Sequence, residues 1–219
     1  MSTDFFPIIP AVLPLALAPL CLLIKHSLFC WSLTVAAMFI SCATSLFTLG
    51  QLSTQNELTY PFGGWDAPVG IEYSIDYLNG VLLFFISGIG LLLSLLYSGS
   101  LRWDLKRSRN YFFYTAFLLT FAGLAGVIAT ADAFNAFVFI EISSLGTYIL
   151  VALGKDKRAL LASYKYLIFG TIGATFFVLG VGILFVLTGS LNFLDISNRL
   201  ESLEQPAAHF TAKIGRAHV

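Results

Sequence analysis

Long apolar segments, separated by short polar ones, occupy most of this chain. Six of them reach the roughly 20 residues that an α-helix needs to cross about 30 Å of hydrocarbon. The pattern therefore predicts an all-α polytopic membrane protein with transmembrane helices at residues 5–24, 27–49, 77–97, 111–131, 133–153 and 162–189. The last segment is long enough to tilt in the bilayer.

The stretch between the second and third predicted helices has a different pattern. Residues 50–76 are mostly polar, and short runs rich in Tyr, Phe and Ile flank the pair Gly63 and Gly64. Such runs around a glycine pair are typical of a β-hairpin. We therefore expect a hairpin loop outside the membrane here.

The first predicted helix contains four prolines, Pro7, Pro10, Pro14 and Pro19. The N-terminus has neither the basic start nor the A-x-A-like exit of a cleaved signal peptide. We predict that this segment is retained as a kinked first transmembrane helix.

Composition supports a membrane protein and narrows the function classes. The 219 residues are 58% hydrophobic, 15% aromatic and 11% charged, with a mean hydropathy of +0.85. These values lie outside the soluble globular range and argue against a soluble hydrolase. Twelve basic and twelve acidic residues cancel, so the expected partner is the lipid bilayer and not a nucleic acid.

Side chains that commonly bind metals are scattered along the chain. Cys21, Cys30 and Cys42 lie in apolar segments at irregular spacing, and the sequence has no CxxC motif and no Cys/His group. We expect buried thiols, no metal site and no bound cofactor.

Charged residues are distributed unevenly between the two ends of the predicted helices. With the N-terminus outside, the hairpin loop and the short turn at Asp132 carry no Lys or Arg, in agreement with the positive-inside rule. We therefore predict a bacterial inner-membrane protein whose N-terminus lies outside. The basic residues inside are then Lys25, Arg102, Lys106, Arg107, Arg109, Lys155, Lys157 and Arg158, and the acidic residues outside include Asp4, Glu57, Asp66, Glu72, Asp76 and Asp132.

One acid belongs to neither membrane surface. Glu141 follows the start of the fifth predicted helix by eight residues, or about 12 Å. An ionised side chain at mid-bilayer costs roughly 2.5–3.5 kcal/mol on insertion scales, so it usually has a partner or a use. Ser144 and Tyr148, at i+3 and i+7, extend a polar stripe on the same helix face. Either this stripe takes part in an ion path, or Glu141 stays protonated and stabilises helix packing.

Two further charged residues are candidates for the same path. Lys165 lies about one turn inside the sixth predicted helix, where it either snorkels to the interface or contributes to a proton path. Asp132 directly precedes the fifth predicted helix, either as its N-cap or as a proton inlet. Lys165 and Glu141 lie at different depths, so direct pairing is not expected without water or another charge between them.

Three segments of the chain together resemble a known family. They read GGWDAPVGIEYSIDYLNG, ATADAFNAFVFIEISSLGTYILVALGKDKRAL and YKYLIFGTIGATFFVLGVGILFVLTGSLN. The chain is similar to the proton-pumping antiporter-like membrane subunits over about residues 55–200, most strongly over 130–189. The D subunits of Mrp-type Na⁺/H⁺ antiporters look closest, and the family also includes membrane subunits of complex I and of energy-converting hydrogenases.

The resemblance implies roles for two of the residues above. Glu141 stands at the position of the family's essential fifth-helix glutamate, and Lys165 matches a sixth-helix basic position of some members. Full-length relatives have about fourteen helices in two inverted repeats, and the seventh-helix lysine that partners the glutamate is not part of this sequence. The family also places its N-terminus outside.

These observations lead to one leading hypothesis and two alternatives. The leading hypothesis is a subunit of a monovalent cation (Na⁺)/proton antiporter, which moves protons along a path centred on Glu141 in a hetero-oligomeric complex. The first alternative is a proton-pumping subunit of an NADH:quinone oxidoreductase or energy-converting hydrogenase, which would make the chain part of a redox-driven enzyme. The second is a membrane scaffold without its own ion path.

We expect the chain to divide into five parts. Residues 1–49 hold the first two helices, 50–76 the hairpin loop, 77–189 the other four helices and 190–213 a connecting loop. Residues 214–219, IGRAHV, are what one reading frame of a common sequencing adapter would encode. We therefore expect a non-native tail on an N-terminal fragment, with a natural polar tail as the alternative.

Overall fold

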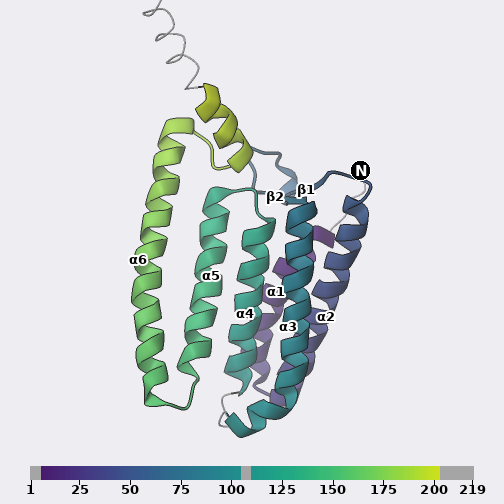
Figure 1. The fold of residues 1–219 in the computed structure, drawn as a ribbon, viewed down its shortest axis with the longest axis vertical. Coiled ribbons are helices and arrows are strands. Elements are labelled where there is room, and N and C mark those ends of the chain that lie inside the picture. Colours follow the sequence, from purple (N-terminus) through teal and green to yellow (C-terminus); the bar gives the residue numbers. More distant parts are fainter. Residues whose placement is uncertain (1–5, 105–109, 203–219) are drawn as a thin grey trace, which may run out of the picture.

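The structure, a computed structural model, describes residues 6–104 and 110–202. Among these residues, six helices run side by side and are long and apolar enough to cross a membrane, as predicted (Figure 1). They are α1 Ile9–Ile24, α2 Ser27–Leu52, α3 Tyr77–Asp104, α4 Asn110–Ala129, α5 Ala133–Ala152 and α6 Lys157–Thr188. A short 3₁₀ helix, η1 Phe6–Ile8, precedes α1.

The prolines of the first segment take different positions in the helix. Pro7 lies in η1 and Pro10 in the first turn of α1, where a missing N–H does no harm. Pro14 and Pro19 lie inside α1. Because proline has no N–H, the helical bonds to the carbonyls four residues earlier cannot form, and α1 must be stabilised by its neighbours.

The predicted hairpin is present. Strands β1 Glu57–Pro61 and β2 Glu72–Asp76 pair antiparallel, with Tyr60 opposite Tyr73. The connection is longer than the glycine pair suggested: residues 62–71 join the strands and begin with the 3₁₀ turn η2 Phe62–Gly64. Gly63 and Gly64 have φ of 65° and 75°, a conformation that favours glycine.

The hairpin is joined to the helices by backbone hydrogen bonds. The N–H of Ala131, between α4 and α5, donates to the Glu72 carbonyl of β2 at 2.9 Å. The Ala131 carbonyl accepts from the N–H of Phe193 at 2.9 Å. Phe193 starts a helical segment, residues 193–202, within the predicted connecting loop. The hairpin and the adjoining ends of α4, α5 and α6 are therefore held together at one end of the molecule.

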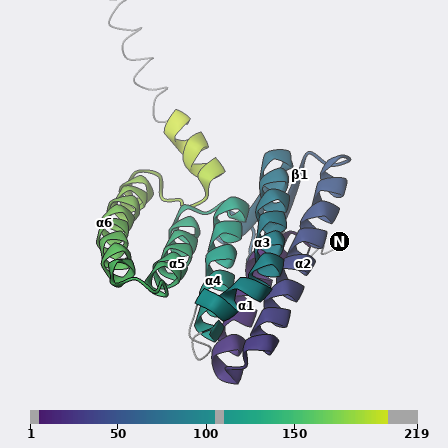
Figure 2. The same cartoon turned by 60° about the horizontal axis from the view of Figure 1, so that its bottom comes forward.

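Helix α4 lies at the centre and α6 at one edge. α4 packs against α1, α2, α3 and α5, and 56% of its membrane-spanning window is buried, compared with 11% for α6. Both views show α5 and α6 extending sideways from the bundle formed by α1 to α4 (Figures 1 and 2). The molecule thus consists of a four-helix bundle and a two-helix extension.

Three helices extend several residues beyond their predicted bounds, and α2 does so by ending at Leu52 and not at 49. α6 begins at Lys157 and not at 162, because the Asp156 side chain caps it by accepting a hydrogen bond from the Arg158 N–H at 3.1 Å. α3 continues to Asp104, past the predicted end at 97. Charged helix ends can project beyond the hydrocarbon, so an apolar pattern underestimates their length. The predicted tail at 214–219 lies outside the described residues.

Candidate functional site

Glu141 lies near the middle of α5, on the helix face turned away from α4. The face toward α4 is fixed by buried Ala136, Phe139 and Gly146, and an added Cβ on Gly146 would lie 2.9 Å from the Ala116 carbonyl oxygen of α4. Glu141 follows Phe139 by two residues, which places it about 200° further around the helix. Its side chain is half-buried.

The face that carries Glu141 is the one that contacts α6. The Phe137 ring stacks on Phe177 of α6, with centroids 6.5 Å apart and planes at 13°. Eleven residues along α5, the Tyr148 hydroxyl lies against the backbone of Gly170. Because residues 137, 141, 144 and 148 share one helix face, the predicted polar stripe points toward α6.

Two contacts join α5 and α6 on either side of Glu141. We call the interface between these two helices the α5–α6 seam. The Phe137–Phe177 pair lies toward the hairpin end of the molecule. At the other end, the Ser163 hydroxyl of α6 donates to the Tyr148 carbonyl at 2.8 Å. Glu141 and Ser144 lie between these contacts, in the interior of the seam.

Small residues of α6 lie level with Glu141. Since α6 contacts α5 at Gly170 and at Phe177, the intervening turn places Gly173 and Ala174 near the depth of the acid. A Cβ added to Gly173 would meet nothing within 4 Å. Within the described residues, the Glu141 carboxylate forms no hydrogen bond or ion pair. The carboxylate thus has no polar partner among the described residues of α6, and Gly173 at this level is exposed.

Lys165 lies on the opposite face of α6. It follows Ser163, which contacts α5, by two residues, so it points about 200° away from that contact, and its side chain is exposed. Because α6 begins at Lys157, Lys165 lies eight residues or about 12 Å inside the helix, deeper than the one turn predicted from the sequence. The structure does not bring Lys165 and Glu141 together.

Asp132 is the N-cap of α5. Its carboxylate accepts a hydrogen bond from the Asn135 N–H at 2.7 Å, and the residue is 7% exposed. Nine residues separate it from Glu141, which corresponds to about 13 Å along the axis and half a turn around it. Of the two readings from the sequence, the structure gives the N-cap geometry.

Two side chains of β2 in the hairpin have pKa values above their ordinary ones. Burial, together with the nearby charges of Glu57 and Asp66, raises the pKa of Glu72 above its ordinary value. Burial also raises the pKa of Tyr73, which packs 6.2 Å from the Phe139 ring between centroids. The surroundings of β2 therefore disfavour the charged forms of Glu72 and Tyr73.

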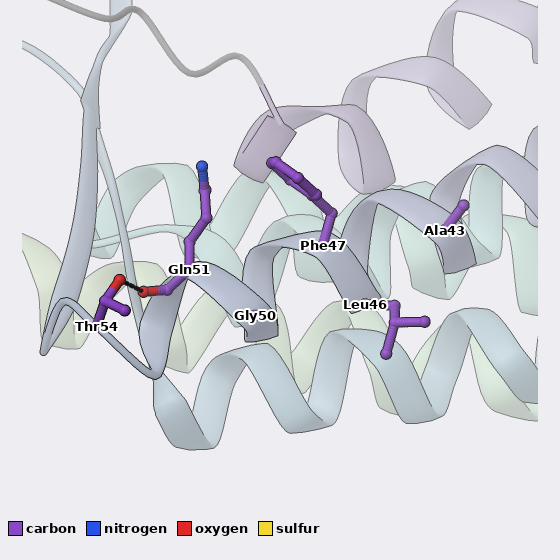
Figure 3. A pocket seen from close by; sticks show the side chains of 6 residues that line it. All are labelled: Ala43, Leu46, Phe47, Gly50, Gln51 and Thr54. Carbon is purple, nitrogen blue, oxygen red and sulfur yellow. Dashed lines mark hydrogen bonds between the residues drawn. The ribbon is translucent and has the colours of Figure 1, made fainter.

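A surface groove lies on α2, far from Glu141. It has a volume of about 620 Å³ and lies along the end of α2 nearest the hairpin (Figure 3). α2 and α6 are at opposite edges of the molecule (Figure 1). The groove is lined by Ala43, Leu46, Phe47, Gly50, Gln51 and Thr54, with no titratable side chain among them.

Sequence reasoning missed the residues that bound the seam. Phe137 and Phe177 were not distinguishable among 21 phenylalanines, and Ser163 is one of many hydroxyls in the helices. Helical spacing is the one signal that points to them. Phe137 lies on the same helix face as Glu141, and Ser163 lies on the same face as Gly170. That signal becomes usable only once α5 and α6 are known to pack together.

Comparison with known proteins assigns a family to this architecture. Residues 130–214 match the family described as NADH:quinone oxidoreductase/Mrp antiporter, transmembrane, and this region contains Glu141 and both helices of the seam. Over these residues the chain resembles this antiporter-like family.

Curated relatives come from two branches of the family. The chain is 39% identical over 204 residues to the N subunit of NADH-quinone oxidoreductase from Desulforudis audaxviator. This alignment covers 92% of the present chain and 40% of the relative. It is 33% identical over 201 residues to the D subunit of the Na⁺/H⁺ antiporter from Bacillus subtilis. This alignment covers 91% of the present chain and 40% of the relative. The chain thus spans about 40% of the length of these relatives. The sequence-based preference for the antiporter branch stays a prediction, because both branches match.

Solved structures show the same fold. The membrane-bound sulfane sulfur reductase, an archaeal respiratory membrane complex, contains a chain that matches with a TM-score of 0.79 at 29% identity, covering 87% of this chain and 39% of that one. A chain of the Mrp complex from Dietzia sp. DQ12-45-1b matches with a TM-score of 0.77 at 21% identity, covering 88% and 36%. The chain therefore has the fold of these membrane subunits, with six helices in the described residues that are long and apolar enough to span a membrane.

Proposed function

We propose that this chain forms part of a proton-translocating subunit in which Glu141 binds and releases the transported proton. The position of the acid supports this proposal. The acid lies in the middle of a membrane-spanning helix, on the α6-facing stripe and away from the tightly packed α4 interface. A carboxyl at this depth binds its proton more tightly when it is desolvated and less tightly when water or a cation approaches.

The geometry favours this role over a purely structural one. An acid that stabilises helix packing is expected to hydrogen-bond across a helix interface. Within the described residues, the Glu141 carboxylate forms no such bond. The side chain is also only half-buried, so a hydrated path or another protein segment can reach it.

The transported cation and the assembly are part of the proposal. Similarity to the D subunit of a Na⁺/H⁺ antiporter supports exchange of Na⁺ or another monovalent cation for protons in a hetero-oligomeric complex. The solved Mrp complex has the same fold in the matching chain. We place the complex in a bacterial inner membrane, with the N-terminus and the hairpin outside.

A second candidate function is redox-driven proton pumping. The 39% identity to the N subunit of an NADH-quinone oxidoreductase supports it. In that case electron transfer in other subunits drives the proton through the same Glu141 seam, so the role of the acid does not change. What differs is the energy source.

Inverted membrane vesicles that contain a complete protein with this sequence test both candidates. An antiporter dissipates an imposed pH gradient when Na⁺ is added, without any electron donor. A redox-driven pump acidifies the vesicle lumen only when NADH or another donor is oxidised. Loss of whichever activity is present on Glu141→Gln supports the Glu141 path, and Ser143→Ala, on the α4 side of the same helix, serves as the control.

A further inference from the structure

Ser41 carries the clearest orphan polar group inside the bundle of α1 to α4. It is 1% exposed, and within the described residues its hydroxyl has no hydrogen-bond partner. Neighbouring buried hydroxyls on α2 are satisfied: the Ser45 hydroxyl donates to the Ser41 carbonyl at 2.7 Å, and that of Thr48 to the Thr44 carbonyl at 2.9 Å. Buried polar groups in membrane helices are normally paired, so Ser41 calls for a partner.

A small cavity adjoins Ser41. Its volume is about 10 Å³, and residues from all four helices of the bundle line it. A polar cavity of roughly 10–15 Å³ admits one water molecule if two to four polar groups surround it. The lining residues that bear on this condition are Ser41 of α2, Ser87 of α3 and Pro10 of α1.

Pro10 and Ser87 both offer acceptors. Pro14 has no N–H, so the Pro10 carbonyl loses the donor that an ordinary helix would supply. The Ser87 hydroxyl uses its hydrogen on the Leu83 carbonyl, at 2.7 Å, and keeps lone pairs free. Ser41 has both a hydrogen and lone pairs available.

We propose that the cavity at Ser41 is a binding site for one structural water molecule. The water accepts from the Ser41 hydroxyl and donates to the Pro10 carbonyl and the Ser87 hydroxyl, which gives it the three hydrogen bonds typical of buried water. It thereby ties the proline-interrupted helix α1 to α2 and α3.

This site is separate from the proposed proton path. The cavity touches α4 through Phe121 and Ala125, whereas Glu141 lies on the face of α5 turned away from α4. The water is therefore a fixed part of the bundle, and the proposal does not depend on the function proposed for Glu141.

Radiolytic footprinting of the 219-residue chain in nanodiscs tests the proposal. X-rays produce hydroxyl radicals from bound water at the site itself, and Met38, which lines the cavity, is 1% exposed and readily oxidised. Cys21 and Cys30 are 0% exposed, also oxidise readily and do not line the cavity. We expect Met38 to be oxidised several-fold faster than either cysteine. Equal rates at all three sulfurs would overturn the proposal.

Substitutions assign the water to its partners. Ser41→Ala should lower the oxidation rate of Met38 several-fold, and Ser45→Ala, which removes a buried hydroxyl that does not line the cavity, should leave it unchanged. If Ser41→Ala does not fold, Pro14→Ala gives the same test, because it returns an N–H to the Pro10 carbonyl and removes one partner of the water. Wild-type oxidation of Met38 in folded Ser41→Ala or Pro14→Ala protein would contradict the assignment.

Discussion

At the scale of single residues, three glycines determine which way Glu141 faces. Gly123 and Gly126 of α4 and Gly146 of α5 let the two backbones approach closely, as small residues do in membrane helices. A Cβ on Gly123 would lie 2.5 Å from the Ser143 nitrogen and 2.7 Å from the Phe139 carbonyl oxygen. Because this contact fixes the α4-facing side of α5, the opposite side, with Glu141, must face α6.

Gly123→Ala should destabilise the protein. The added methyl group meets backbone atoms that cannot move independently, so α4 and α5 must separate, and overpacking of this kind costs about 1–3 kcal/mol. Unfolding of the purified protein in mixed micelles measures the loss. The control is Gly173→Ala, whose added Cβ meets nothing within 4 Å and should be neutral. Equal stability of the two variants would show that α4 and α5 do not pack as described.

The sequence predicted the composition of the site but not its orientation. The stripe of Glu141, Ser144 and Tyr148 follows from helical spacing alone. Its direction depends on which face of α5 meets α4, and α5 has apolar residues on every side. The unpaired hydroxyl of Ser41 could not be predicted from the sequence either. α2 contains several serines and threonines, and only the packing shows which of their hydroxyls lack a hydrogen bond.

At the scale of elements, the β-hairpin is bonded to the connection between α4 and α5. Its strand β2 bonds to the α4–α5 connection through Glu72 and Ala131, and Tyr73 packs against α5 through Phe139. Burial and neighbouring acids raise the pKa of Glu72, so the folded state binds the Glu72 proton more tightly than the unfolded state does. The contribution of Glu72 to stability is therefore greatest at acid pH and falls as the pH rises from its ordinary value of 4.5 through the raised folded value.

Glu72→Gln should stabilise the protein at neutral pH. The gain should be less than about 1 kcal/mol, because solvent screens this partly exposed site. It should disappear well below pH 4.5, where the acid is protonated in both states. Thermal unfolding of both proteins across this pH range measures it, with exposed Glu201→Gln as the control. A gain that does not depend on pH would show that the charge of Glu72 is not its source.

Elements were predictable where one physical signal dominates. Six helices followed from stretches of about 20 apolar residues, and the hairpin from its glycines and aromatic runs. The ends were not predictable in the same way. α6 starts five residues early because Asp156 caps a helix that includes Lys157 and Arg158, and these charged residues weaken the apolar pattern near its start.

At the scale of the whole molecule, two described links that carry lysine lie at the same end of the helices. The links that carry Lys25 and Lys155 lie at the end opposite the hairpin and residues 193–202 (Figure 1). From the positive-inside rule we predict that the hairpin lies outside the membrane. The two-helix extension, with Glu141 in its seam, spans the membrane between these ends.

Cysteine labelling tests this orientation. In a background without the three native cysteines, Thr59→Cys in β1 should react with a membrane-impermeant maleimide in intact cells. Lys155→Cys, in the α5–α6 link, should react only after permeabilisation. The two positions control for each other, because both are exposed. The reverse pattern would show that the membrane orientation is inverted.

Proton flux per assembled complex in the Glu141→Gln variant tests whether Glu141 carries the proton. Glutamine keeps the size and much of the hydrogen bonding of glutamate but cannot release a proton. In a complete protein with this sequence, reconstituted with its partner subunits, we predict normal amounts of assembled complex and loss of nearly all flux, with part of it retained in Glu141→Asp. Wild-type flux in a fully assembled Glu141→Gln complex would contradict the account.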